Sequence, residues 1–246
     1  DGNYPVGTDN VALGDTALDS LTSGVQNTAI GSLALTSLTS ASTNTAIGYA
    51  ALTANTSGST NVSVGRQSML ANTTGTQNSA LGGNALYSNT SGSYNVALGN
   101  EALQANTASG NTAVGYRAAV TNTTGIITAV GYQAGFNNTT ANATTVIGYQ
   151  AGEANTTGGN LTAIGRAAAL SNTTGASITA VGPNALNDNT TGSYNTAIGH
   201  LALRFNTTAS NNTAVGYQAG YSNTTGSENT AIGKFSLQSN TTGSNN

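Results

Sequence analysis

Hydrophobic and polar positions along the chain recur with a period of 17 residues. An aliphatic residue followed by glycine returns fourteen times, and the spacing is 17 residues except for two steps of 16. Two positions before the aliphatic residue there is usually Thr or Val, so the alternation predicts a short strand in every repeat. A chain of such units needs no single compact core. The anchor glycines are Gly14, Gly31, Gly48, Gly65, Gly82, Gly99, Gly115, Gly131, Gly148, Gly165, Gly182, Gly199, Gly216 and Gly233.

Each predicted strand has one inward and one outward face. We expect the aliphatic column, represented by Ile164 and Ile198, to point inward together with the Thr or Val two positions earlier. The residue between them is Ala in most repeats, as at Ala46 and Ala97, and is then expected to point outward. This predicts a smooth, uncharged Ala stripe to which another copy could pack closely. The alternative is a coil so thin that both columns are partly internal.

A second short strand is predicted around the Ala-Leu pair that follows each glycine, as at Ala51 and Leu52, although Gly152 takes the Leu position in one repeat. The next segment reads Asn-Thr-Thr-Gly or a close variant. Asn and Gly accept positive φ, so this segment is a turn, and the two shortened steps are expected to lose their residue there. A column of Asn from Asn55 to Asn240 predicts a hydrogen-bonded amide ladder inside these turns.

Two strands and two turns in about 17 residues predict one coil of a β-solenoid. The expected fold is therefore all-β, a single-chain parallel β-roll of about fourteen coils, with residues 1–9 as an N-terminal extension and 10–246 as the repeat array. Stacked at about 4.8 Å, the coils would form a rod on the order of 60 to 70 Å long. Helical repeats need longer units, and the Gly in each repeat would break the helices.

Composition argues against partners that are recognised by charge. Charged residues make up only 5% of the chain, the net charge is −3, and the five Lys and Arg residues are scattered. We therefore expect no binding to nucleic acid, no attraction to anionic membranes and, without a long apolar run, no membrane insertion. The absence of Cys is compatible with an extracellular location. The chain opens at Asp1, which we interpret as a processed mature form.

No catalytic constellation is visible. His200 is the only histidine and follows an anchor glycine, where a structural or merely exposed role is expected. The acidic residues form neither a carboxylate pair nor a calcium loop, and the glycines lack the context of a phosphate loop. We expect no enzyme, no cofactor, and no catalytic, cofactor-binding or metal-binding residues. The acids considered are Asp15, Asp19, Glu101, Glu153, Asp188 and Glu228.

Aromatic residues offer one candidate binding feature. Tyr116, Tyr132 and Tyr149 occupy the same column of three successive repeats, with Tyr49 and Tyr217 in that column elsewhere. Such a ladder could hold sugar rings or another protein, or could simply stabilise a corner of the rod. The three phenylalanines, Phe136, Phe205 and Phe235, occupy different columns and predict no stripe.

Asn-x-Ser/Thr sequons recur through the array, and they are either glycosylation acceptors or good turn residues. One Asn cannot be both an inward ladder amide and a glycan carrier. Ice binding would need Thr-x-Thr pairs on a flat strand face, whereas the paired threonines here are adjacent and lie in a turn. The sequons include Asn55, Asn61, Asn72, Asn89, Asn122, Asn138, Asn155, Asn172, Asn189, Asn206, Asn223 and Asn240.

The segments 10–14, 61–65 and 95–99 read Asn-Val-Ala-Leu-Gly, Asn-Val-Ser-Val-Gly and Asn-Val-Ala-Leu-Gly. This motif resembles the head repeats of trimeric autotransporter adhesins, and similar repeats occur in phage tail-fibre-like proteins. The resemblance implies a left-handed parallel β-roll and a role at a cell or virus surface, with a homotrimer as one arrangement.

Two functional classes remain open. The first is an extracellular structural protein that assembles with itself, with the Ala stripe and the ends of the chain pointing to self-association. The first two repeats carry Leu21 and Leu38 in the Asn column, and the last repeat stops within its turn, so head-to-tail stacking into a filament is expected. The second class is an adhesin head or tail-fibre shaft that binds a host surface or glycans. We expect the protein to be its own main partner, with surface glycans as a further candidate.

Overall fold

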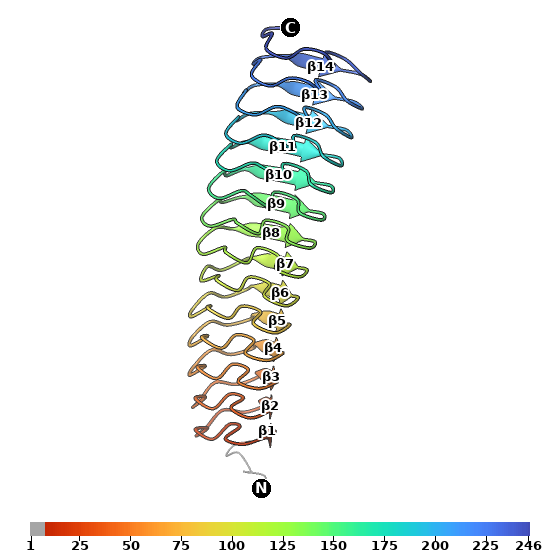
Figure 1. Ribbon diagram of the computed structural model, residues 1–246. Helices are drawn as coiled ribbons and strands as arrows, with labels where there is room; N and C mark the ends of the chain where they lie inside the picture. Colours follow the sequence, from red (N-terminus) through yellow and green to blue (C-terminus); the bar gives the residue numbers. More distant parts are fainter. Residues whose placement is uncertain (1–7) are drawn as a thin grey trace. The chain divides into compact units, whose positions relative to one another are not determined.

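The computed structural model describes residues 8–246, which form an all-β solenoid (Figure 1). Every repeat contributes one short strand, and none of the residues from 8 onward forms a helix. The chain divides into two compact units, Asp1–Thr124 and Gly125–Asn246. The expected class, an all-β single-chain β-solenoid with a 17-residue repeat, is confirmed. The predicted extension over residues 1–9 lies mostly outside the described residues and stays a prediction.

The described part of the first unit contains seven strands, and the second unit also contains seven. Those of the first unit are β1 (Val11–Leu13), β2 (Thr28–Ile30), β3 (Thr45–Ile47), β4 (Val62–Val64), β5 (Ser79–Leu81), β6 (Val96–Leu98) and β7 (Thr112–Val114). Those of the second unit are β8 (Ile127–Val130), β9 (Thr144–Ile147), β10 (Leu161–Ile164), β11 (Ile178–Val181), β12 (Thr196–Ile198), β13 (Thr213–Val215) and β14 (Thr230–Ile232).

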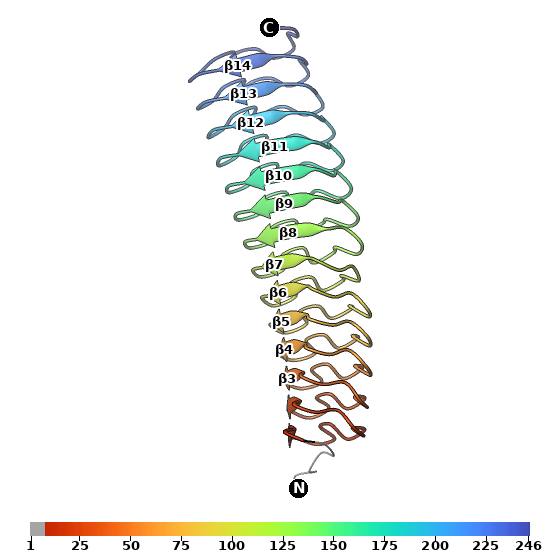
Figure 2. The same cartoon turned by 180° about the vertical axis from the view of Figure 1, so that it is seen from behind.

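Within each unit the strands pair in parallel and in exact repeat register. Thr28 lies opposite Thr45, and Thr179 lies opposite Thr196. Seen from behind, the strands of each unit again follow one another in chain order (Figure 2). Equivalent residues of successive repeats therefore stack directly on one another, and each column of the sequence becomes a row along the unit.

The prediction of a second strand in each coil is wrong. The segment after the anchor glycine forms a series of turns in which every other residue has left-handed backbone torsions, for example Leu33 at φ 64° and Leu35 at φ 51°. Alternation of right- and left-handed residues cannot build a pleated strand. These turns still hydrogen-bond from coil to coil, since Leu35 N donates to Ala51 O at 3.1 Å. The Leu of this segment points into the core and is fully buried.

The assignment of the two strand faces is also wrong, because the structure reverses it. Ala46 and Ala163 are fully buried, whereas the neighbouring Ile47 and Ile164 are both 36% exposed. The inner side of each strand faces the Leu of the turn segment across a narrow interior, and only a small side chain fits between them. The predicted outward Ala stripe is therefore the core, and the aliphatic column lies outside.

The anchor glycines are required where coils approach one another most closely. Gly48 has φ +132°, and a Cβ added there would lie 2.6 Å from the carbonyl oxygen of Gly65 in the next coil. No L-residue adopts this torsion without strain, and no side chain fits in this gap.

The predicted amide ladder is confirmed within each unit. In the second unit the side-chain amide of Asn172 donates to the Asn155 amide oxygen at 2.8 Å and to Gly175 O at 3.0 Å. In the first unit Asn89 donates in the same way to Asn72 at 2.9 Å. These Asn side chains are fully buried, and their amide nitrogens are hydrogen-bonded. The ladder is interrupted at the shortened repeat, where the amide oxygen of Asn89 has no hydrogen-bond partner.

A second Asn ladder occupies the column four positions before the anchor glycine, and the sequence analysis did not assign it. Asn61 accepts from the backbone N–H of Asn78 at 3.0 Å, while its own amide donates to Gly75 O at 2.8 Å. In the second unit this column holds Ile127, Thr144, Leu161 and Ile178 before Asn returns at position 195. The strands with these four residues, β8 to β11, are one residue longer than the others.

The first shortened repeat loses its residue in the turn, as expected. Asn106 donates to the carbonyl of Ala108, two residues on, whereas Asn55 donates to Gly58, three residues on. Ala108 thus takes the place of the turn glycine, and Thr112 keeps its strand register with Val96. The second shortened step spans the division between the two units.

Candidate functional site

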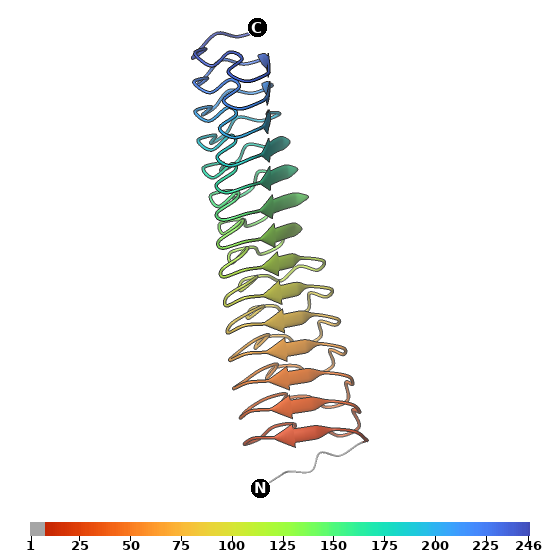
Figure 3. The ribbon, with the colours of Figure 1, turned by 90° about the vertical axis from the view of Figure 1, so that its right-hand side faces the viewer.

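The outer side of the strands is a continuous feature of each unit, and we call it the Thr/aliphatic face. It consists of two columns, the residue before each anchor glycine and the residue two positions earlier. Figure 3 shows the strands of the first unit broadside, one above another. Ile198 is 40% exposed and Leu81 is 55% exposed, so these side chains are available to a partner.

The composition of this face is uniform. In the second unit the residue directly before each anchor glycine is always Val or Ile. The residue two positions earlier is Thr in every strand, at positions 128, 145, 162, 179, 196, 213 and 230. In the first unit both columns hold Thr, Ser, Val, Leu or Ile. No charged residue occurs in either column of the described strands. Exposed apolar area without charge at its centre is the composition of an interface core.

The sequence-predicted candidates for chemistry are dispersed. His200 is exposed, and its ring centroid lies 5.5 Å from that of Tyr217, so it belongs to an aromatic cluster and contacts no acid. Glu101 pairs with Arg117 at 2.9 Å, and Asp188 pairs with Arg204. Within residues 8–246 no three His, Asp or Glu side chains come together as a metal site would require.

Glu153 has a raised pKa in the folded chain. Partial burial removes water from its carboxyl group and raises its pKa above the ordinary value of 4.5. It lies in the turn segment of the second unit, where its backbone carbonyl accepts from Asn137 N at 2.9 Å. Because no second acid or base within residues 8–246 pairs with this carboxyl group, we interpret Glu153 as part of the turn and not as a catalytic candidate.

The tyrosine ladder is present. Tyr132 and Tyr149 stack with ring centroids 5.1 Å apart and planes 7° apart, and both remain about half exposed. Tyr116 occupies the equivalent position in the first unit. Stacking covers the faces that the two rings turn toward each other, and the contact joins two successive coils at this corner.

The phenylalanines form no stripe, as expected. Phe205 meets Tyr221 edge-on with centroids 4.9 Å apart, whereas Phe235 meets Tyr217 at 5.4 Å. Phe136 is half-buried. These contacts concentrate aromatic rings in the last three coils of the second unit, a grouping that the column-by-column sequence analysis missed. The sequence signal was the clustering of aromatic and cationic residues between positions 200 and 235.

The sequon asparagines are part of the buried ladders. Asn155, Asn172 and Asn61 are fully buried, and their amides are hydrogen-bonded. A glycan on such an amide nitrogen would have to displace the neighbouring coil. The turn threonines beside them bond between coils, with Thr173 Oγ1 donating to Thr190 O at 2.9 Å. In the folded chain these Asn and Thr side chains therefore form hydrogen bonds that hold the coils together.

No family model, curated protein or solved structure matches this chain. None of the described residues forms a helix of the length and apolarity needed to cross a membrane. The function must therefore be argued from the surfaces of the solenoid itself.

Proposed function

We propose that this protein is a non-catalytic structural component of an extracellular fibre or surface filament, whose copies associate through the Thr/aliphatic face. The observation that carries the proposal is the exposure of the aliphatic column, with Ile164 at 36%, Ile198 at 40% and Ile232 at 68%. Self-association would remove this apolar surface from water, the main favourable term in protein association.

The regular spacing of the coils favours a second copy of the chain as the partner that packs on the Thr/aliphatic face. Equivalent residues on the face recur once per coil, at about 4.8 Å along each unit. A partner that packs into every coil must have the same repeat, and another copy has it by construction. Since the two columns contain no charge, identical faces can meet without like-charge repulsion.

The arrangement of copies is part of the proposal. The shared face supports lateral packing, which includes the homotrimer implied by the resemblance to adhesin heads and tail-fibre shafts. Head-to-tail stacking into a filament stays a prediction that these surfaces neither favour nor oppose. An extracellular or cell-surface location is likewise proposed, and its support is the motif resemblance.

Sedimentation velocity of the purified chain over a range of concentrations tests this proposal. We expect a defined oligomer or a fibre for the native sequence and a monomer for the double variant Ile164→Lys/Ile198→Lys. Both side chains are exposed, so circular dichroism should show that the variant is still folded. The matched control is Thr174→Lys, at an exposed turn position, which should assemble like the native chain.

A monomeric native chain at high concentration would overturn the proposal. So would unchanged assembly of the double variant. If the monomer also slowed ice growth, the Thr and Val or Ile columns would instead be an ice-binding surface, and the interpretation as an interface between copies would be wrong.

A further inference from the structure

The second unit carries a row of exposed aromatic and cationic side chains directly after its anchor glycines. We call this row the aromatic-cationic ridge. It occupies a different column from the Thr/aliphatic face, and nothing in the proposed self-association uses it. All of its residues are exposed, and none is a carboxylate. The ridge consists of Tyr132, Tyr149, Arg166, Pro183, His200, Tyr217 and Lys234.

The backbone holds the ridge in strict register. From Tyr132 to Tyr217, each ridge carbonyl accepts a hydrogen bond from the coil that follows, as Tyr149 O does from Ala167 N at 2.9 Å and His200 O does from Gln218 N at 3.0 Å. Arg166, His200 and Lys234 are successively two repeats apart. Because neighbouring coils lie about 4.8 Å apart, these three polar groups recur at about 9.6 Å along the unit.

The ridge ends in an open aromatic cluster. The rings of Tyr217 and Phe235 meet with planes 69° apart, and His200 is tilted by 52° to Tyr217. Unlike the stacked pair, tilted rings leave parts of their faces uncovered. The Lys234 ammonium nitrogen lies 4.7 Å from the Phe235 ring centroid and 5.9 Å from that of Tyr217. A positive charge and exposed ring surface are thus presented together.

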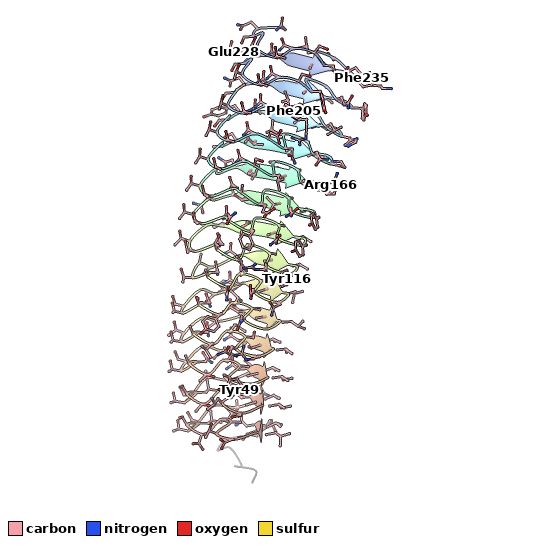
Figure 4. The ribbon with its side chains drawn as sticks, viewed as in Figure 1. Tyr49, Tyr116, Arg166, Phe205, Glu228 and Phe235 are labelled. Atoms are coloured by element: carbon pink, nitrogen blue, oxygen red, sulfur yellow. The ribbon has the colours of Figure 1, made fainter. Side chains whose placement is uncertain are left out.

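Glu228 and Asp188 of the second unit do not neutralise the cations of the ridge. Figure 4 shows Arg166 and Phe235 at one edge of this unit and Glu228 at the opposite edge. Asp188 is paired with Arg204, outside the ridge. Neither Arg166 nor Lys234 forms a salt bridge with any residue of the described chain.

We propose that the ridge binds an acidic polysaccharide with one carboxylate for every two sugars, lying along the unit. The apolar faces of sugar rings would pack on Tyr217 and Phe235, and carboxylates would pair with Arg166 and Lys234. An extended polysaccharide brings a carboxylate to the same side after two sugars, a rise comparable to the two-coil spacing of Arg166, His200 and Lys234, so every second carboxylate would meet a cation. His200 lies between these cations and supplies a hydrogen-bonding imidazole.

The low charge density favours this ligand over a nucleic acid. A single strand carries a phosphate on every nucleotide, and its binding draws on many closely spaced cations together with stacked bases. The ridge offers two permanently charged groups four coils apart. Such widely spaced cations suit a polymer whose charges are separated by neutral units.

Calorimetric titration at low salt with hyaluronan fragments, in which glucuronate alternates with a neutral sugar, tests the proposal. We expect measurable binding by the native chain and none to dextran, which has no carboxylate. The triple variant Arg166→Gln/His200→Gln/Lys234→Gln should bind hyaluronan roughly tenfold more weakly or worse, since it loses three exposed polar contacts. Tyr217→Ala should weaken binding through lost ring contact, and Lys234→Arg should retain it.

The matched control is Tyr194→Ala, which removes a tyrosine that is 66% exposed outside the ridge and should bind like the native chain. No hyaluronan binding by the native chain, or equal loss in Tyr194→Ala, would overturn the proposal. Tighter binding to oligothymidylate than to hyaluronan would assign the ridge to single-stranded nucleic acid instead. Sedimentation of the same variants shows whether assembly is intact, so failure of ridge binding and failure of self-association can be told apart.

Discussion

Val146 fills the space that Gly152 leaves in the core of the second unit. Val146 stands where most strands have Ala, and Gly152 stands where most other coils have Leu. A Cβ added to Gly152 would lie only 2.7 Å from Cγ1 of Val146. The larger residue on one side of the coil thus compensates for the smaller one on the other.

This relationship predicts strong coupling between the two positions. Gly152→Ala alone should destabilise the protein by about 1–3 kcal/mol through overpacking, and Val146→Ala alone by about 2 kcal/mol through a cavity. The double variant should be more stable than the sum of these losses implies, because Ala then meets Ala. The left-handed backbone of Gly152 does not forbid Gly152→Ala, since Ala119 and Ala169 have left-handed torsions at equivalent positions. Thermal denaturation of the four proteins measures the coupling, and strictly additive losses would contradict it.

The reversed faces predict opposite results for two adjacent residues. Ala163→Asp should unfold the surrounding coils, at a cost of about 3 kcal/mol or more, because it buries an unpaired charge. Ile164→Asp should cost less than about 1 kcal/mol, because its side chain is in contact with water. Circular dichroism and melting temperature distinguish the two variants. If Ile164→Asp proved the more damaging, the face assignment would be wrong.

The face assignment also shows what the sequence could and could not predict. The 17-residue glycine step, the buried Asn172 column and the turn deletion before Asn111 followed from residue types with strict positional requirements. The faces did not, because Ile47 is more hydrophobic than Ala46 and only the width of the coil interior decides which one fits inside. The prediction of a strand in the turn segment was wrong because strand propensity does not reveal a left-handed leucine such as Leu35. The tyrosines of the ridge were recognised as one column, but Arg166 and Lys234 were interpreted as scattered cations because they lie 68 residues apart in sequence.

The anchor glycines predict a sharp difference between two glycine positions of the second unit. Gly165 has φ +132°, and an added Cβ would lie 2.7 Å from the carbonyl oxygen of Gly182. We expect Gly165→Ala to cost about 2 kcal/mol or more, since it combines torsional strain with a backbone clash. Gly159→Ala is the control, because its added Cβ would lie 3.3 Å from Asn142 O. Equal melting temperatures for the two variants would count against this explanation.

Glu153 predicts a pH dependence with a defined sign. Burial raises its pKa in the folded chain above the unfolded value, so the folded state holds the proton more tightly. Its contribution to stability is present below the unfolded pKa and is lost as pH rises through the folded pKa. Glu153→Gln should therefore gain stability relative to the native chain as pH rises from acidic to neutral. Melting curves across this range test the sign, with the exposed Glu228→Gln as control, and a gain confined to acidic pH would refute it.

The amide ladder predicts that one buried Asn affects its neighbours on both sides. Asn172 donates to the Asn155 amide oxygen at 2.8 Å and accepts from the Asn189 amide at 2.8 Å. Asn172→Ala therefore leaves polar groups unpaired in the adjacent coils, at a cost of about 1–3 kcal/mol for each unsatisfied group. Thr174→Ala in the same turn is exposed and should change stability by less than about 0.5 kcal/mol. Hydrogen exchange should show faster opening of the coils around Asn155 and Asn189 in Asn172→Ala only. Exchange restricted to the mutated coil would mean that the amides act as separate turn caps and not as a ladder.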